Sequence, residues 1–264
     1  MEALEKIKGD DKLKFEEMIN TIQLGNCYEL IKDIPDKSVD CIYVDVPYLY
    51  ESGSHGESEL SQRIYKYQKK DLQSAGIYDG FDYKIYDEFL RISKKVNIFI
   101  WCSRLQIVDT LNYFVNKGFK YNILVWCKTN PTPATNNSWL PDIEYCLVFR
   151  DSNTKLNDGY ELKSKWYTSP INQSDKALFN HPTIKPLELV KRHILHSTQE
   201  NDIVLDCFCG SGTTCVACKE TGRRYIGMEI DKEYWKIANN RINGIEASGQ
   251  MTIMFDDKGD ILND

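Results

Sequence analysis

The chain has 264 residues, a formal net charge of −6, 42% hydrophobic residues and 27% charged residues. This composition is ordinary for a globular protein and excludes a collagen-like, coiled-coil or disordered chain. No apolar run approaches the roughly 18 residues that span a bilayer, and the charged N-terminus lacks a signal-peptide core. We therefore expect a cytoplasmic protein with reduced cysteines. The charge is uneven, at −8 over 1–60 and +6 over 61–128, which allows a basic face for a polyanion.

Runs of β-branched and aromatic residues alternate with helical patterns along the chain. We predict strands at about 21–24, 40–46, 96–101, 121–127, 144–149, 202–207 and 224–229, and helices at about 27–33, 82–94, 104–117, 186–198, 212–221 and 231–243. The alternation indicates an α/β fold with a doubly wound, mostly parallel, seven-stranded sheet. Ligands of such sheets bind at the carboxyl ends of the strands, so the residues that follow each strand are the candidate site.

An acidic tetrapeptide ends the second predicted strand. Asp45, Val46, Pro47 and Tyr48 offer a carboxylate, a backbone carbonyl, a rigid turn and a planar ring. Such groups can hold an amino group of an aromatic base while the ring stacks on it. The plain alternative is a strand that ends in a proline turn.

A glycine loop follows the strand that ends at Asp206. It contains Phe208, Gly210, Ser211 and Gly212, and a helix follows with Thr213 and Thr214. Glycines at such a turn let the backbone approach a ligand. Seventeen residues after Gly212, Glu229 closes the next strand, where a carboxylate can accept hydrogen bonds from both ribose hydroxyls of a nucleoside. The spacing matches neither a dinucleotide fingerprint nor a P-loop, and an ordinary tight turn is the alternative.

The same stretch carries Cys207, Cys209, Cys215 and Cys218, and the last two have the spacing of zinc ligands. A zinc ribbon would break the predicted strand and helix. We therefore expect small buried thiols and no metal.

Together these motifs resemble those of the S-adenosylmethionine-dependent amino-methyltransferases of DNA. DVPY resembles their catalytic Asp/Ser/Asn-Pro-Pro-Tyr, and DCFCGSGTT resembles their cofactor motif. Three more stretches agree in order, at 24–27 (LGNC), 126–133 (WCKTNPTP) and 181–186 (HPTIKP). The catalytic motif comes before the glycine loop, as in the permuted β class of bacterial and phage restriction-modification systems. The resemblance covers about residues 20–243.

The resemblance implies a Rossmann-like methyltransferase that acts on N6 of a flipped-out adenine in double-stranded DNA. Asp45 and the carbonyl of Val46 would accept the two amino N–H bonds, Tyr48 would stack on the base, and Pro47 would join the base and cofactor pockets. No metal is needed. The implied cofactor-binding residues are Asn26, Lys185, Asp206, Phe208, Gly210, Ser211, Gly212, Thr213, Thr214 and Glu229. A cytosine-N4 enzyme, an RNA or protein methyltransferase and a non-catalytic subunit remain as alternatives.

The chain then divides into a catalytic half at 1–149 with a mobile loop at 50–80, a target-recognition segment at 150–180, and a cofactor half at 181–264. Candidate DNA contacts are Lys155, Lys163, Lys165, Trp166 and Tyr167. The resemblance implies double-stranded DNA as the partner and allows a homodimer. We expect no membrane partner, because the chain has no apolar run long enough to span a bilayer.

Two residues depart from the family pattern. Asn26 replaces an aspartate that reads the adenine of the cofactor, and its side-chain oxygen can still accept a hydrogen bond. Val46 replaces the first proline of the catalytic motif. We expect Val46→Pro to be tolerated because the motif lies just past a strand end. The alternative is that the N–H of residue 46 is hydrogen-bonded, in which case proline would destabilise the site.

Overall fold

The computed structural model describes residues 14–49, 80–131, 139–171 and 184–245. Within these residues the chain forms one eight-stranded sheet, with β1 Thr21–Leu24, β2 Cys41–Asp45, β3 Asn97–Cys102, β4 Lys120–Lys128, β5 Ile143–Arg150, β6 Trp166–Ser169, β7 Ile203–Asp206 and β8 Arg224–Glu229. The helices are α1 Phe15–Met18, α2 Cys27–Leu30, η1 Ile31–Asp33, α4 Ile85–Ile92, α5 Ile107–Val115, η2 Glu161–Lys163, α7 Leu187–Ser197, α8 Thr213–Glu220 and α9 Lys232–Ile242. Each predicted strand and helix is confirmed within a few residues.

The strand order is β1-β8-β7-β2-β3-β5-β4-β6. The first five strands in this order, β1, β8, β7, β2 and β3, are parallel to their neighbours. The strand β5 runs antiparallel to both β3 and β4, and β6 is parallel to β4. The α/β fold and the mostly parallel sheet are confirmed, but the expected count of seven strands is one too low. The eighth strand, β6, comes from the segment 150–180. It has four residues and no buried side chain, so its apolar pattern is too weak to predict a strand.

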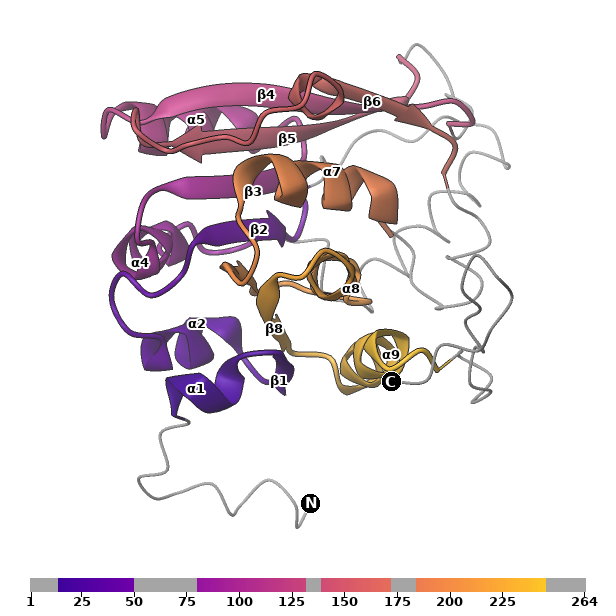
Figure 1. Ribbon diagram of the computed structural model, residues 1–264. Helices are drawn as coiled ribbons and strands as arrows, with labels where there is room; N and C mark the ends of the chain where they lie inside the picture. Colours follow the sequence, from indigo (N-terminus) through magenta and orange to yellow (C-terminus); the bar gives the residue numbers. More distant parts are fainter. Residues whose placement is uncertain (1–13, 50–79, 132–138, 172–183, 246–264) are drawn as a thin grey trace.

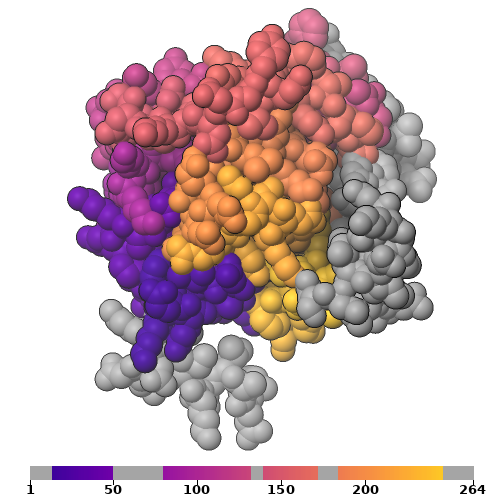
Figure 2. Space-filling model, in the orientation of Figure 1, coloured from indigo at the N-terminus to yellow at the C-terminus, as the bar shows by residue number. Residues whose placement is uncertain are grey.

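Helices cover both faces of the sheet (Figure 1). Successive side chains of a strand point to opposite faces, so β2 sends Ile42 and Val44 to one core and Cys41 and Tyr43 to the other. The first core includes side chains of α4 and α5, and the second includes side chains of α7, α8 and α9. Figure 2 shows the layer of α7 to α9 in orange to yellow.

The cysteines of the glycine-loop stretch lie in these two cores. Cys207 packs in the first, and Cys209, Cys215 and Cys218 pack in the second. Across the described ranges, no three His, Cys, Asp or Glu side chains are grouped so that they could hold a metal ion. Every helix in this part of the chain is too short or too polar to cross a bilayer.

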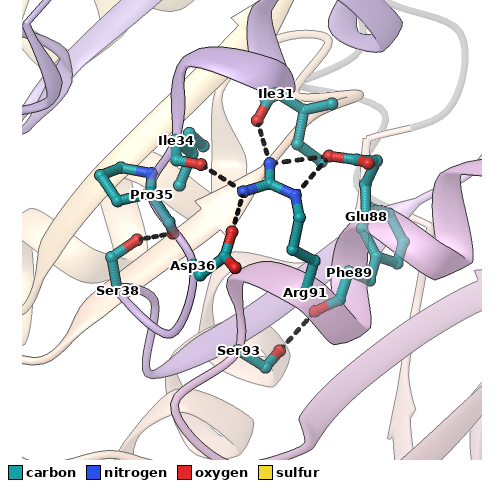
Figure 3. A network of polar contacts seen from close by, with 9 residues as sticks. All are labelled: Ile31, Ile34, Pro35, Asp36, Ser38, Glu88, Phe89, Arg91 and Ser93. Atoms are coloured by element: carbon teal, nitrogen blue, oxygen red, sulfur yellow. Dashed lines mark hydrogen bonds and ion pairs between the residues drawn. The ribbon is translucent and has the colours of Figure 1, made fainter.

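Arg91 of α4 holds the turn that leads into β2 (Figure 3). Its guanidinium donates to the carbonyls of Ile34 at 2.8 Å and Ile31 at 3.0 Å. It also pairs with Asp36 at 2.7 Å and with Glu88 at 2.7 Å. The planar fork of arginine meets these acceptors at once, which a lysine ammonium cannot do. The turn before the strand that carries Asp45 is therefore fixed to α4.

We predict that Arg91→Lys lowers the free energy of unfolding by about 1–3 kcal/mol, because carbonyls and a carboxylate lose charged donors. Urea denaturation checks this against Lys32→Gln, which removes an exposed i,i+3 pair with Glu29 worth at most about 0.5 kcal/mol. Equal midpoints for the two variants would show that the Arg91 contacts add nothing to stability.

Candidate active site

The chemistry-bearing residues gather at one edge of the sheet because the strands that precede them are parallel and adjacent. β2 ends at Asp45, β7 at Asp206 and β8 at Glu229, and β7 lies between the other two. The antiparallel strand β5 begins at this same edge, since its Tyr145 pairs with the last residue of β3, Cys102. The tetrapeptide and the glycine loop are therefore neighbours in space, as the sequence predicts.

Asp45 forms an ion pair with Lys185, which precedes α7. Lys185 Nζ lies 2.5 Å from Asp45 Oδ2, and it also donates to Tyr48 OH at 3.3 Å. The other carboxylate oxygen, Oδ1, is buried and accepts no hydrogen bond from the residues that the structure describes. Burial raises the pKa of Asp45, and the charge of Lys185 opposes this rise. A buried acceptor without a donor costs about 1–3 kcal/mol, so Oδ1 is suited to a donor from a substrate.

Glu144 and Lys128 complete this charged cluster. Glu144 accepts from Lys185 at 3.0 Å through Oε2 and from Lys128 at 2.7 Å through Oε1. Burial alone would raise the pKa of Glu144, but the two ammonium groups lower it to about 2. Burial opposes the charge of Lys185, yet the carboxylates of Asp45 and Glu144 raise its pKa. The cluster holds two cations and two anions, so it is neutral overall.

The backbone of the tetrapeptide is fixed by two hydrogen bonds. The N–H of Val46 donates to the carbonyl of Trp101 at 3.2 Å, which extends the β2–β3 ladder by one residue. The side-chain amide of Gln106 donates to the carbonyl of Pro47 at 3.0 Å, while its oxygen accepts from the N–H of Ser103. The expected tolerance of Val46→Pro is corrected here, because proline would delete the first of these bonds.

The glycine loop is braced by the two carboxylates at the ends of β7 and β8. Gly210 N–H donates to Glu229 Oε2 at 2.8 Å, and Asp231 N–H donates to Glu229 Oε1 at 2.8 Å. Phe208 N–H donates to Asp206 Oδ1 at 3.1 Å. Backbone N–H groups therefore fix this carboxylate in place, and the acceptor sites that they leave on its oxygens suit the hydroxyls of a ribose.

Gly212 is needed for packing. Its φ is +79°, and a Cβ there would lie 3.0 Å from the Cβ of Ala238 in α9. A side chain at this position would disturb the fold whether or not a ligand is bound.

Several predicted cofactor residues already have bonds within the protein. Thr213 Oγ1 accepts from Arg241 at 2.8 Å, and the same nitrogen lies 3.3 Å from Ser211 Oγ. Asn26 caps α2, since its Oδ1 accepts from the N–H of Tyr28 at 2.9 Å. It lies beside the cofactor edge, because the adjacent Gly25 N–H donates to the carbonyl of Glu229.

The predicted DNA contacts lie on and around β6. Trp166 is 61% exposed, and the ring of Tyr167 lies under the guanidinium of Arg192 at 5.1 Å. Lys163 pairs with Asp158 at 3.1 Å, and Lys155 and Lys165 are exposed. Because β6 is parallel to β4, it ends at the same edge as Lys128. Residues 50–79 of the predicted mobile loop and 181–183 of the HPTIKP stretch lie outside the described residues.

Comparison with known proteins decides the family. The family model described as DNA methylase, for N6 and N4 methyltransferases, matches residues 39–240, which is more than half of the chain. The chain belongs to this family. It is a DNA methyltransferase whose cofactor is S-adenosylmethionine, so the resemblance seen in its motifs is confirmed together with the enzyme class.

Relatives and solved structures agree with this assignment. The methyltransferase is 33% identical over 237 residues to the type II methyltransferase M2.LlaDCHI of Lactococcus lactis subsp. cremoris, with 83% of this chain and 87% of the relative covered. It is 31% identical over 237 residues to the type II methyltransferase M2.DpnII of Streptococcus pneumoniae, again with 83% of this chain and 87% of the relative covered. The crystal structure of an M1.HpyAVI–SAM complex is 25% identical with a TM-score of 0.62, covering 84% of this chain and 98% of the other. The cytosine-N4-specific PvuII methyltransferase shares the fold at 14% identity, with a TM-score of 0.60, 83% of this chain and 85% of the other.

Sequence reasoning missed three residues of this site, namely Lys128, Glu144 and Gln106. Glu144 and Lys128 are joined through the antiparallel strands β4 and β5, whose direction the sequence does not show. Gln106 precedes α5 in an ordinary polar turn. The one usable signal was Lys128 itself, which stands inside the WCKTNPTP stretch.

We predict that Val46→Pro lowers the single-turnover methylation rate about fivefold, because one backbone hydrogen bond of about 1 kcal/mol is lost where the proposed catalytic loop begins. The matched control is Val46→Ala, which shortens the side chain but keeps the N–H. Rates measured beside thermal melts separate the two effects. A Val46→Pro protein as active as Val46→Ala would show that the bond to Trp101 is dispensable.

Asp206 gives a pH prediction. Burial raises its pKa from 3.8 to about 7, opposed by hydrogen bonds from Thr214 and Phe208. The folded state therefore binds a proton that the unfolded state has released, and the stability linked to this group is complete below about pH 4 and is lost as the pH rises to 7. The unfolding free energy of wild type minus that of Asp206→Asn should fall over this window, by up to about 1.4 kcal/mol per pH unit. A difference that stays constant from pH 4 to 7 would contradict the buried, protonated aspartic acid.

Proposed function

We propose that the enzyme transfers a methyl group to the exocyclic N6 of an adenine flipped out of double-stranded DNA at a specific sequence. The observation that carries this proposal is the buried Asp45 Oδ1, which has no donor among the described residues, while Lys185 holds the other oxygen of the same carboxylate. An aromatic amino group is a poor nucleophile because its lone pair is delocalised into the ring. Acceptors on its N–H bonds localise that pair on the nitrogen. Asp45 Oδ1 and the carbonyl of Val46 are the proposed acceptors.

Tyr48 follows these two acceptors and is proposed to stack on the base. Pro47 would separate the base from the cofactor, and Gln106 holds its carbonyl. After transfer the amino nitrogen carries one proton too many. Asp45 is placed to take it, since burial raises the pKa of its carboxyl group and makes it a better base. Positioning and electrostatics would supply the rate enhancement.

The proposed cofactor site consists of the glycine-loop residues and their neighbours at the ends of the adjacent strands. When bound, S-adenosylmethionine supplies the electrophilic methyl group. Glu229 would accept from the ribose hydroxyls, and Asn26 would contact the adenine. Thr213 and Thr214 are proposed at the methionine carboxylate, and the wall of the pocket is assigned to Asp206, Phe208, Gly210, Ser211 and Gly212.

The contacts of Lys185 favour a different role from the cofactor binding that the resemblance implies. All three N–H bonds of its ammonium have acceptors within the protein, at Asp45, Glu144 and Tyr48. We therefore propose that Lys185 acts on Asp45 and not on the cofactor.

Residues 150–180 are proposed as the segment that recognises the DNA sequence, between a catalytic half at 1–149 and a cofactor half at 181–264. The exposed Trp166 and Lys165 of this segment support the proposal, since aromatic and basic side chains suit bases and phosphates. The relatives named above come from bacteria, whose DNA lies in the cytoplasm, and we propose that compartment. The homodimer that the family allows stays a prediction.

Mapping of modified bases in DNA from cells that express the protein tests the proposed function. We expect N6-methyladenine at one recognition sequence. Asp45→Ala should reduce methylation at least about 10²-fold while calorimetry shows unchanged cofactor binding. N4-methylcytosine would move the proposal to the other base. Cofactor binding without any DNA methylation by the wild type would overturn it.

A further inference from the structure

We propose that Glu144 is a positioning residue of the methyl transfer, which holds the Lys185 ammonium so that Asp45 Oδ1 stays open for the substrate amino group. The inference rests on the proposed function of Asp45 and adds a residue that neither motif contains.

The first support is the way in which the three N–H donors of Lys185 are shared among their acceptors. The ammonium of Lys185 has three N–H bonds, and their acceptors are Asp45 Oδ2 at 2.5 Å, Glu144 Oε2 at 3.0 Å and Tyr48 OH at 3.3 Å. An ammonium is a compact charge on a flexible stem, so its donors turn to whichever acceptors are near. Without Glu144 one donor would lack this acceptor, and Asp45 Oδ1, which has no partner among the described residues, belongs to the same carboxylate that Lys185 already contacts. Lysine would then occupy the oxygen that the substrate needs.

The second support is that Glu144 also reaches the stacking residue. Tyr48 OH donates to Glu144 Oε2 at 3.4 Å and accepts from Lys185 at 3.3 Å. Glu144, Lys185 and Tyr48 therefore form a closed triangle of contacts. A displacement of Glu144 would free one donor of the Lys185 ammonium and would take an acceptor from Tyr48.

The third support is rigidity and charge balance. Glu144 lies on β5 and Lys128 on β4, and the register pairs Glu144 with Trp126, so both side chains are held by strands and not by a loop. Lys128 binds Glu144 Oε1 at 2.7 Å, and its ammonium also lies 5.3 Å from the centre of the Trp126 ring. A buried anion is tolerated only when it is paired. Lys128 balances Glu144, which leaves Lys185 to balance Asp45.

The charge of Glu144 also acts on the ionisation of Asp45. Glu144 raises the pKa of Asp45, because a second negative charge disfavours ionisation, whereas Lys185 lowers it. The groups that face Asp45 are Lys185 before α7, Glu144 and Cys146 of β5, Tyr43 of β2, Cys102 of β3, Asp206 of β7 and Tyr48 of its own turn. Removing the charge of Glu144 should lower the pKa of Asp45. Removing that of Lys128 should raise it, because Glu144 is then uncompensated.

The test measures single-turnover methylation rates against pH for wild type, Glu144→Gln, Glu144→Asp and Lys128→Gln. Glu188→Gln serves as the matched control, because Glu188 is exposed and pairs with Lys191 on α7. For Glu144→Gln we expect the rate to fall at least about tenfold while KM for S-adenosylmethionine changes less than about twofold. The acid limb of the profile should move to lower pH in Glu144→Gln and to higher pH in Lys128→Gln. Glu144→Asp should recover part of the rate.

Two results would overturn the inference. One is a Glu144→Gln enzyme with the rate and acid limb of wild type. The other is a slower Glu144→Gln enzyme whose pH–rate profile keeps the acid and basic limbs of wild type, since a purely structural role would give that pattern. Failure of the proposed function is distinct, because it would appear as an inactive wild type or an active Asp45→Ala. If Glu144→Gln fails to fold, the shift in Lys128→Gln alone decides.

Discussion

The buried ion pair between Lys185 and Asp45 is the interaction on which the active site depends. It joins residues 140 positions apart in the chain and fixes the segment before α7 to the end of β2. Two charges taken out of water are costly unless each is paired and hydrogen-bonded. Here Glu144 and Lys128 complete the pairing, and the whole cluster remains neutral. Among the residues that the structure describes, Asp45 Oδ1 is the buried side-chain atom of this cluster without a hydrogen-bond partner, and it lies where the proposed chemistry needs an acceptor.

The sheet topology determines which residues meet. Parallel neighbours β2, β7 and β8 place three carboxylates in a row at one edge, at Asp45, Asp206 and Glu229. The two outer carboxylates differ in what they contact, since Asp45 faces the proposed base and Glu229 braces the glycine loop. The antiparallel β5 adds a residue from its start and not from its end, which is how Glu144 reaches the same edge.

The sequence predicts the part of this arrangement that depends on apolar periodicity and on local motifs. Strands such as β2 and β3 are continuous apolar runs, and the turns that follow them carry recognisable residues. The contacts of Lys185 could not be predicted, because they depend on packing between residues 140 positions apart. Glu144 was missed because it precedes a strand whose antiparallel direction has no local signal. The expected tolerance of Val46→Pro depended on placing the motif just past a strand end, and a sequence pattern does not fix whether the ladder stops at residue 45 or at residue 46.

A crystal structure of the enzyme with cognate DNA and the demethylated cofactor tests whether Asp45 Oδ1 receives the substrate amino group. We expect adenine N6 within about 2.7–3.2 Å of Asp45 Oδ1, with Lys185 still bound to Oδ2 and Glu144 still bound to Lys185. Lys185 bound to the carboxylate of the cofactor, with Asp45 turned away from the base, would contradict it.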